Sequence, residues 1–141
     1  MNWVRAVVSI VSHFAVVGAA NCLAFLGAGR LAEVLCRRAA VWLADSDLII
    51  QVAFIRSRAG DLEGALDCLD QFQSPLPQHK WQLLRAIYSG MFCENNHRAD
   101  RAVSFFEAAT THPAIPDDTK GALQARIRRL RSVYAGVARG A

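Results

Sequence analysis

Histidine and cysteine are the residue types in this sequence best suited to chemistry, because both bind metal ions and both can take part in nucleophilic catalysis. Cys93 and His97 stand four residues apart, which places two side chains on one face of a helix. The sequence has no H-E-x-x-H motif, no C-x-x-C pair and no carboxylate cluster to complete a ligand set. We therefore predict no metal site, and we interpret His97 as a polar turn residue.

The glycines and hydroxyl residues do not form a catalytic pattern either. The glycines match neither G-x-G-x-x-G nor the P-loop, and no predicted strand precedes them. A helical chain without a strained strand-to-helix turn also offers no candidate serine nucleophile. The sequence thus predicts a protein that is not an enzyme and that needs no cofactor.

The four cysteines, Cys22, Cys36, Cys68 and Cys93, are far apart, and each falls within an apolar helical pattern. A disulfide framework or a zinc ribbon would need closer pairs. The spacing is typical of buried free thiols, which favours a reducing compartment.

The elements that carry these residues belong to an apolar chain of one-domain size. It has 141 residues, of which 53% are hydrophobic and 20% charged. This is ample material for a buried core and a low charge content for a free soluble protein. We expect a partner or a membrane to cover part of its apolar surface.

A segment without charged residues, Ala6–Gly29, is long enough to span a bilayer as a helix. A signal peptide is one alternative, because Arg5 precedes the segment and Gly18–Ala20 could form a cleavage site. A buried solenoid helix is the other alternative. On a helical wheel, Arg5 and three polar residues of the segment fall on one side together with two apolar residues: Arg5, Ser9, Ser12, His13, Val16 and Ala20.

If the segment spans a membrane, the flanking charges predict its orientation. Arg30, Arg37 and Arg38 follow it with only Glu33 opposing them, whereas Arg5 and the amino terminus precede it. The positive-inside bias then places the helical domain in the cytoplasm, as part of a single-pass membrane protein.

Apolar segments of helical period, separated by Gly, Pro and Asp, indicate an all-α fold. Asp61 after Gly60, and Ser46 or Asp45, are expected helix caps. The helices predicted after the apolar segment are 30–44, 46–59, 61–73, 78–94, 98–111 and 116–137. We divide the chain into an apolar N-terminal helix (1–29), helical repeats (30–115) and a basic amphipathic helix with its tail (116–141).

A small residue recurs at the start of every second helix: Ala32, Ala65 and Ala102, at offsets of 33 and 37 residues. Cys36, Leu69 and Phe106 follow four residues later, and Pro77 and Pro113 stand near the ends of two repeats. This pattern resembles the tetratricopeptide repeat, whose period is about 34 residues. The third repeat departs from it, since it lacks the glycine and carries about three extra residues near 94–97.

The resemblance implies a short α-solenoid with a C-terminal capping helix, acting as a surface that holds other proteins. The first helix of each pair would line the concave face. In the clearest repeat, this face would present Asp47, Ile50, Phe54, Ser57 and Arg58 to a partner.

Basic residues are concentrated in the last helix, where Lys120 and the residues after it include no acid. Arg128, Arg129 and Arg131 are predicted to form an exposed basic patch. Such a patch suits an acidic protein partner or anionic lipid, whereas the acidic body of the chain and the core-like aromatic residues make nucleic acid an unlikely ligand.

The sequence therefore predicts a non-catalytic scaffold or accessory subunit of a membrane-associated complex, held at the membrane by its N-terminal helix. The alternative is a soluble adaptor or chaperone of the same repeat type, in which that helix is buried.

Overall fold

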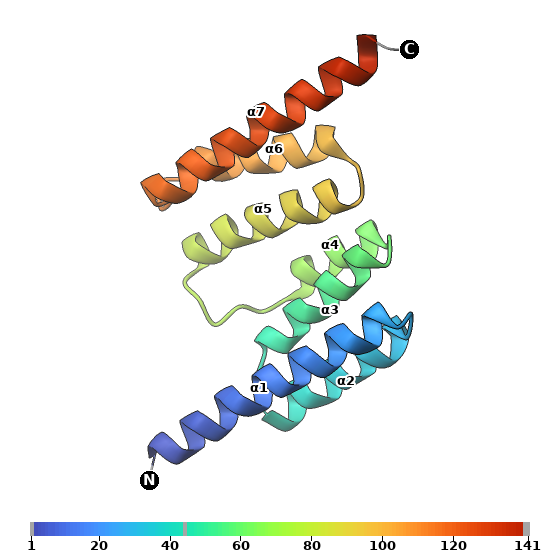
Figure 1. Cartoon of the computed structure of the whole chain (residues 1–141). Helices are drawn as coiled ribbons and strands as arrows, with labels where there is room; N and C mark the ends of the chain where they lie inside the picture. The colour runs from blue at the N-terminus through green and yellow to red at the C-terminus, as the bar shows by residue number, and fades with distance from the viewer. Residues whose placement is uncertain (1, 44, 140–141) are drawn as a thin grey trace. The chain divides into compact units, whose positions relative to one another are not determined.

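The computed structural model describes residues 2–43 and 45–139, and over these residues the chain contains helices and no strands (Figure 1). Their bounds are α1 Asn2–Phe25, α2 Gly29–Leu43, α3 Asp47–Arg58, α4 Leu62–Gln71, α5 Gln78–Asn95, α6 Ala99–Thr110 and α7 Asp117–Arg139. The predicted ends of α2 to α7 lie within two residues of these bounds, so the all-α prediction is confirmed.

Helix contacts divide the chain into two compact units, Met1–Gln73 and Ser74–Ala141. The boundary falls inside the repeat region predicted for 30–115. The N-terminal helix belongs to the first unit, because α1 contacts both α2 and α3. The last helix likewise belongs to the second unit, where α7 contacts α6.

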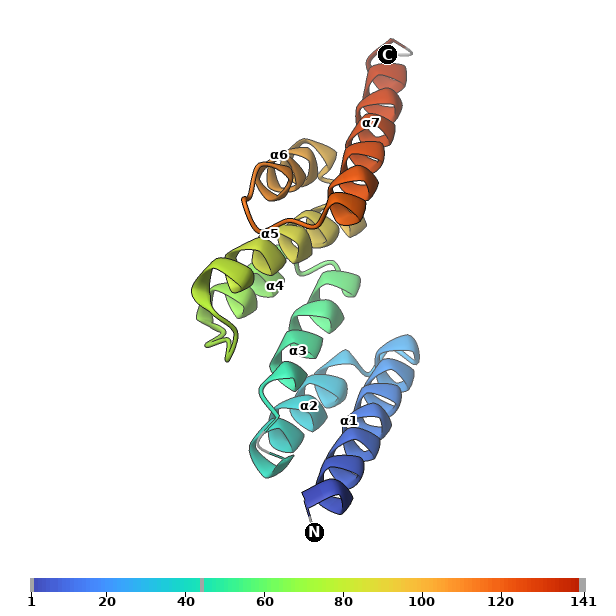
Figure 2. The ribbon, with the colours of Figure 1, turned by 90° about the vertical axis from the view of Figure 1, so that its left-hand side faces the viewer.

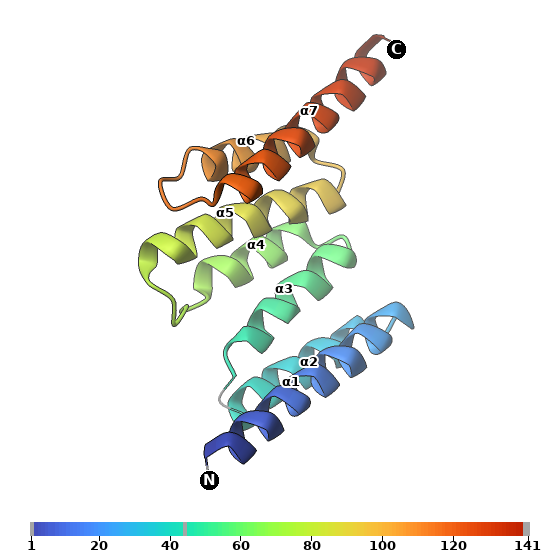
Figure 3. The same ribbon diagram turned by 60° about the vertical axis from the view of Figure 1, so that its left-hand side comes forward.

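In the first unit, α1 and α2 run side by side, with α3 on one side of the pair and α4 packed against α3 (Figures 2 and 3). The small residues Ala32 and Ala65 are fully buried where helices approach one another. Larger apolar side chains fill the remaining space: Cys36, Leu48, Val52 and Leu69.

In the second unit, α5 packs against α6 and α6 packs against α7. Phe92, Cys93 and Phe106 are fully buried, and Ala102 is the buried small residue of this hairpin. Leu123 and Ile127 bring the apolar face of α7 into the same core.

The breaks between helices have local causes. Gly60 has a left-handed φ of 85°, and the Asp61 carboxylate then accepts a hydrogen bond from the Gly64 amide at 3.0 Å. Asp45 accepts from the Asp47 amide at 3.1 Å, whereas Ser46 makes no capping bond through its side chain. His97 has a φ of 57°, so its prediction as a turn residue is confirmed.

Candidate functional site

One side of α1 packs against the rest of the first unit. Ala20 is buried, and Ser12, His13 and Val16 are partly buried. His13 Nδ1 lies 2.6 Å from Asp45 Oδ2, and Arg58 Nη1 donates to Asn21 Oδ1 at 2.8 Å. Ser12, His13, Val16 and Ala20 therefore form the inward stripe that the helical wheel indicated. Ser9 is exposed, and the side chain of Arg5 lies outside the described residues.

The opposite side of α1 is apolar and exposed. Of the segment Val7–Phe25, 6% is buried, and Ala20 is its buried residue. Among the described residues, α1 is the one helix long and apolar enough to cross a membrane, judged by length and composition. Its exposed large side chains are Trp3, Val7, Val8, Ile10, Val11, Phe14 and Phe25.

The solvent side of α2 combines apolar and basic residues. Arg30, Arg37 and Arg38 are exposed in the same helix as four exposed apolar side chains. Those four are Leu31, Val34, Val41 and Trp42, the last with 91% exposure. The sequence analysis missed this apolar set, although its 3–4-residue spacing around the arginines was a usable signal.

The one acidic residue of α2, Glu33, points away from this surface. Its carboxylate accepts three hydrogen bonds of 3.1–3.2 Å from the Arg56 guanidinium of α3. The hydrogen bond with Glu33 raises the pKa of Arg56, so the guanidinium stays charged.

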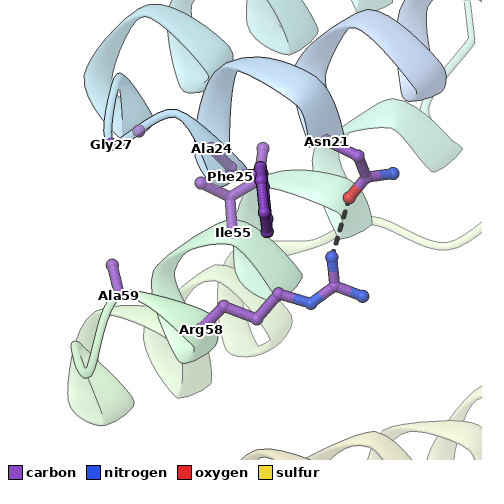
Figure 4. A pocket seen from close by; sticks show the side chains of 8 residues that line it. Asn21, Ala24, Phe25, Gly27, Ile55, Arg58 and Ala59 are labelled. Carbon is purple, nitrogen blue, oxygen red and sulfur yellow. Dashed lines mark hydrogen bonds between the residues drawn. The ribbon is translucent and has the colours of Figure 1, made fainter.

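A cavity of about 380 Å³ opens between the C-terminal ends of α1 and α3. Arg58 and Asn21 supply its polar side, and Phe25, Ala24 and Ile55 supply its apolar side (Figure 4). The Phe25 ring is 91% exposed. Sequence reasoning pointed to Arg58 but missed the α1 residues, because their contribution depends on how α1 packs against α3.

The predicted concave residues of α3 do not share one environment. Asp47 and Arg58 are exposed, and Ile50 and Phe54 are partly buried. Ser57 is only 2% exposed, so its expected position on an open face is wrong. The reason is that α3 packs against α1, α2 and α4, which buries a wider arc than its own apolar stripe indicates.

The predicted basic patch of α7 is exposed but largely paired. Arg129 Nη2 lies 2.9 Å from Glu94 Oε1 of α5, and Arg131 pairs with Glu107 of α6. Arg126 also pairs with Glu94 and lies over the Phe106 ring, 5.4 Å from its centroid.

Arg128 differs from its neighbours in the patch. It is exposed, and the described residues supply no ion pair to it. All three arginines are thus exposed, as predicted, but acids 35 and 24 residues earlier in the chain reach Arg129 and Arg131.

The cysteines are free thiols within the described part of the chain. Cys36, Cys68 and Cys93 are buried as predicted, whereas Cys22 is exposed on α1. Burial, followed by the charge of Glu33, raises the pKa of Cys36. No group of three or more potential metal ligands occurs among the described residues.

A scan against protein-family models, a search of the curated proteins and a search of the solved structures found no match to this chain. Function is therefore inferred from the contacts and exposed surfaces of the chain itself.

Proposed function

We propose that the chain is a non-catalytic scaffold or accessory subunit of a membrane-associated complex, built as a short tetratricopeptide-like solenoid. The observation that carries this proposal is the exposed apolar side of α1. Between Val7 and Phe25 the buried residue is Ala20, which lies on the inward stripe. Contiguous apolar surface of this kind marks contact with a membrane or another protein. Within the first unit, the described residues leave this side of α1 uncovered.

The solenoid part of the proposal is supported by the recurring small residues. Ala32, Ala65 and Ala102 are each fully buried, which lets α2, α4 and α6 approach their neighbours closely. In this reading α1–α2, α3–α4 and α5–α6 are three hairpins, and α7 is the capping helix.

The partner protein is proposed to bind at the cavity lined by Phe25, Ile55, Asn21 and Arg58. Phe25 and Ile55 offer apolar contact, while the Arg58 guanidinium donates hydrogen bonds to carbonyl or carboxylate oxygens. An aromatic side chain beside an arginine is a combination enriched where proteins bind one another.

The runner-up is a soluble adaptor or chaperone with α1 buried. The exposure of Val11, Phe14 and Phe25 counts against burial of α1 within its own chain. A soluble protein of this kind would need its partner to cover the whole helix.

Membrane attachment is tested by fractionating cells that produce the full chain. We expect the protein in the membrane fraction. Recovery of the whole population in the soluble fraction would contradict the proposal and favour the soluble adaptor.

Partner binding is tested by placing a photo-crosslinking amino acid at Phe25, which lines the cavity and is exposed. We expect one discrete protein adduct, which Arg58→Glu abolishes. The same crosslinker at Lys80, an exposed residue of α5, serves as the matched control and should not yield that adduct. Equal adducts from both positions would contradict the cavity assignment.

The proposed cytoplasmic orientation is tested by thiol labelling. Because Cys68 and Cys93 are buried, an accessible thiol must be introduced. Lys80→Cys supplies one in a chain whose own exposed thiol is removed by Cys22→Ser. We expect an impermeant maleimide to label it only after cells are permeabilised. Labelling in intact cells would place the helical domain outside.

A further inference from the structure

The α1–α2 hairpin has an unusual charge distribution. Residues 1–43 contain four arginines and a single acid, Glu33. Glu33 is turned inward, where Arg56 holds it. The outer surface of the hairpin therefore carries positive charge that no acidic residue of the hairpin neutralises.

The exposed arginines lie among exposed apolar side chains. Arg30 precedes Leu31 in the first turn of α2, and Arg38 lies between Val34 and Trp42, one turn from each. Neither Arg30 nor Arg38 has an ion-pair partner among the described residues. Arg37 is turned toward α4, where Nη2 lies 4.0 Å from Cys68 Sγ.

We propose that the outer surface of the α1–α2 hairpin binds an anionic lipid bilayer, with α1 lying in the interface and not spanning it. We call this surface the α1–α2 lipid face and define it by its apolar and basic members: Val7, Val8, Val11, Phe14, Arg30, Leu31, Val34, Arg38, Val41 and Trp42. The inference rests on the proposed membrane association and specifies how it occurs. Apolar side chains combined with Trp and with Arg, whose guanidinium can reach up to the headgroups, are typical of interfacial helices on anionic lipid.

Polar contacts on the inner side of α1 argue against a span. His13 is bonded to Asp45, and Asn21 to Arg58, so α1 is tied both to the α2–α3 connection and to α3. Crossing the bilayer would either break these contacts or draw α2, with Glu33 and Arg38, into hydrocarbon. Charged side chains are costly at that depth, whereas an interfacial position leaves them in the headgroup region.

A second copy of the chain fits this surface poorly. A two-fold interface brings the same patch of each subunit together, so Arg30 and Arg38 would face the defined members of the α1–α2 lipid face, which include no acid. Asp45 and Asp47 line a shallow depression with Phe14 at one edge of the face, and Asp45 is already bonded to His13. Anionic headgroups supply the missing negative charge along the whole face.

The test is flotation of the purified full chain with phosphatidylcholine vesicles, either pure or containing phosphatidylserine. Wild type should float with the anionic vesicles and bind pure phosphatidylcholine much more weakly. Each arginine near an anionic surface contributes roughly fivefold to partitioning, so Arg30→Gln with Arg38→Gln should reduce it by roughly 25-fold. Lys80→Gln with Lys120→Gln, an equal charge change at exposed residues of the second unit, should leave flotation unchanged.

The depth of α2 in the bilayer is measured by the fluorescence of Trp42. The substitutions Trp3→Phe and Trp81→Phe leave Trp42 as the single tryptophan. Lipids brominated near the headgroup end of the acyl chain should quench its fluorescence more than lipids brominated near the methyl end. Circular dichroism checks that every variant keeps its helices.

Three other outcomes would overturn the inference, and they separate it from the proposed function. Bound protein that resists alkaline carbonate would show a spanning helix, so the interfacial mode fails while membrane association stands. Equal flotation of wild type and of the arginine variant would show that the charges of Arg30 and Arg38 do not contribute to vesicle binding. A chain that binds no vesicles and sediments as a dimer would show that a second copy covers the face, and then both proposals fail.

Discussion

Gly90 lies within α5 at the point where the Phe106 ring of α6 packs against the helix backbone. A Cβ on Gly90 would stand 2.4 Å from Cε1 of Phe106. The ring is fully buried and also lies against the Arg126 guanidinium, so it has little room to move. The glycine is therefore needed for close approach of α5 and α6.

We predict that Gly90→Ala lowers the free energy of unfolding by about 1–3 kcal/mol, because overpacking outweighs the better helix propensity of alanine. Urea denaturation measures the change. Gly121→Ala in α7 is the matched control, since its Cβ would meet nothing within 4 Å. It should stabilise the protein by roughly 0.5–1 kcal/mol, and a loss of stability in both variants would contradict the close-contact explanation.

Glu94 joins α5 to α7 through Arg126 and Arg129, and its side chain is largely shielded from solvent. Glu94→Gln should cost about 1–2 kcal/mol of unfolding free energy, because two charge-assisted bonds are weakened in a partly buried site. Glu107→Gln, which disturbs the exposed pair with Arg131, should cost less than about 1 kcal/mol. Equal effects in denaturation experiments would contradict this ranking.

At the scale of the helix, α4 begins with the Asp61 cap. Asp61→Ala should destabilise the first unit by about 1 kcal/mol, since the Gly64 amide loses its acceptor. Ser46→Ala is the control at the start of α3, where the serine side chain makes no capping bond, and it should have almost no effect. The two variants are compared by chemical denaturation, and a larger loss for Ser46→Ala would refute the capping assignment.

Another property of the helices is the division of α1 into two sides. Its inward stripe meets α2 and α3 through small or polar residues, including Ala20 and His13. Its outward side is apolar along almost the whole helix. A helix of high overall hydropathy can therefore be anchored to protein along one side and remain open to a second apolar phase along the other.

At the scale of the whole molecule, the rate of thiol modification should distinguish Cys22 from the other cysteines. Maleimide should modify Cys22 rapidly in native buffer, because it is exposed. Cys36, Cys68 and Cys93 should react only in denaturant, and the raised pKa of Cys36 further lowers its reactive thiolate fraction. Mass spectrometry after timed labelling measures the order, and rapid native labelling of Cys36 would contradict the packing of α2.

The C-terminal patch should act through Arg128 alone, since Arg129 and Arg131 are paired within their own unit. If an acidic partner binds there, Arg128→Glu should weaken its capture by roughly fivefold at low salt without shifting the thermal midpoint. Lys80→Glu makes the same charge change elsewhere and should have no such effect. If the Arg128 variant binds the partner as well as wild type does, and salt does not affect binding, the patch is a solvent-exposed surface with no role in partner binding.

The sequence by itself determined the helices, their ends and the apolar N-terminal segment. These features depend on contacts within about four residues, such as the Asp61 cap and the turn at Gly60. It also placed three of the four cysteines correctly, because burial in a helix follows the period of its apolar residues.

Tertiary structure alone decided which side of each helix stays open. Ser57 is buried because α3 meets three other helices, and Arg131 is paired because α6 brings Glu107 beside it. The apolar side of α1, the arginines of α2 and the cavity at Arg58 likewise depend on partners more than 20 residues away in the chain. Local periodicity carries no information about such distant neighbours, and their packing determines which surfaces remain available for a membrane or another protein.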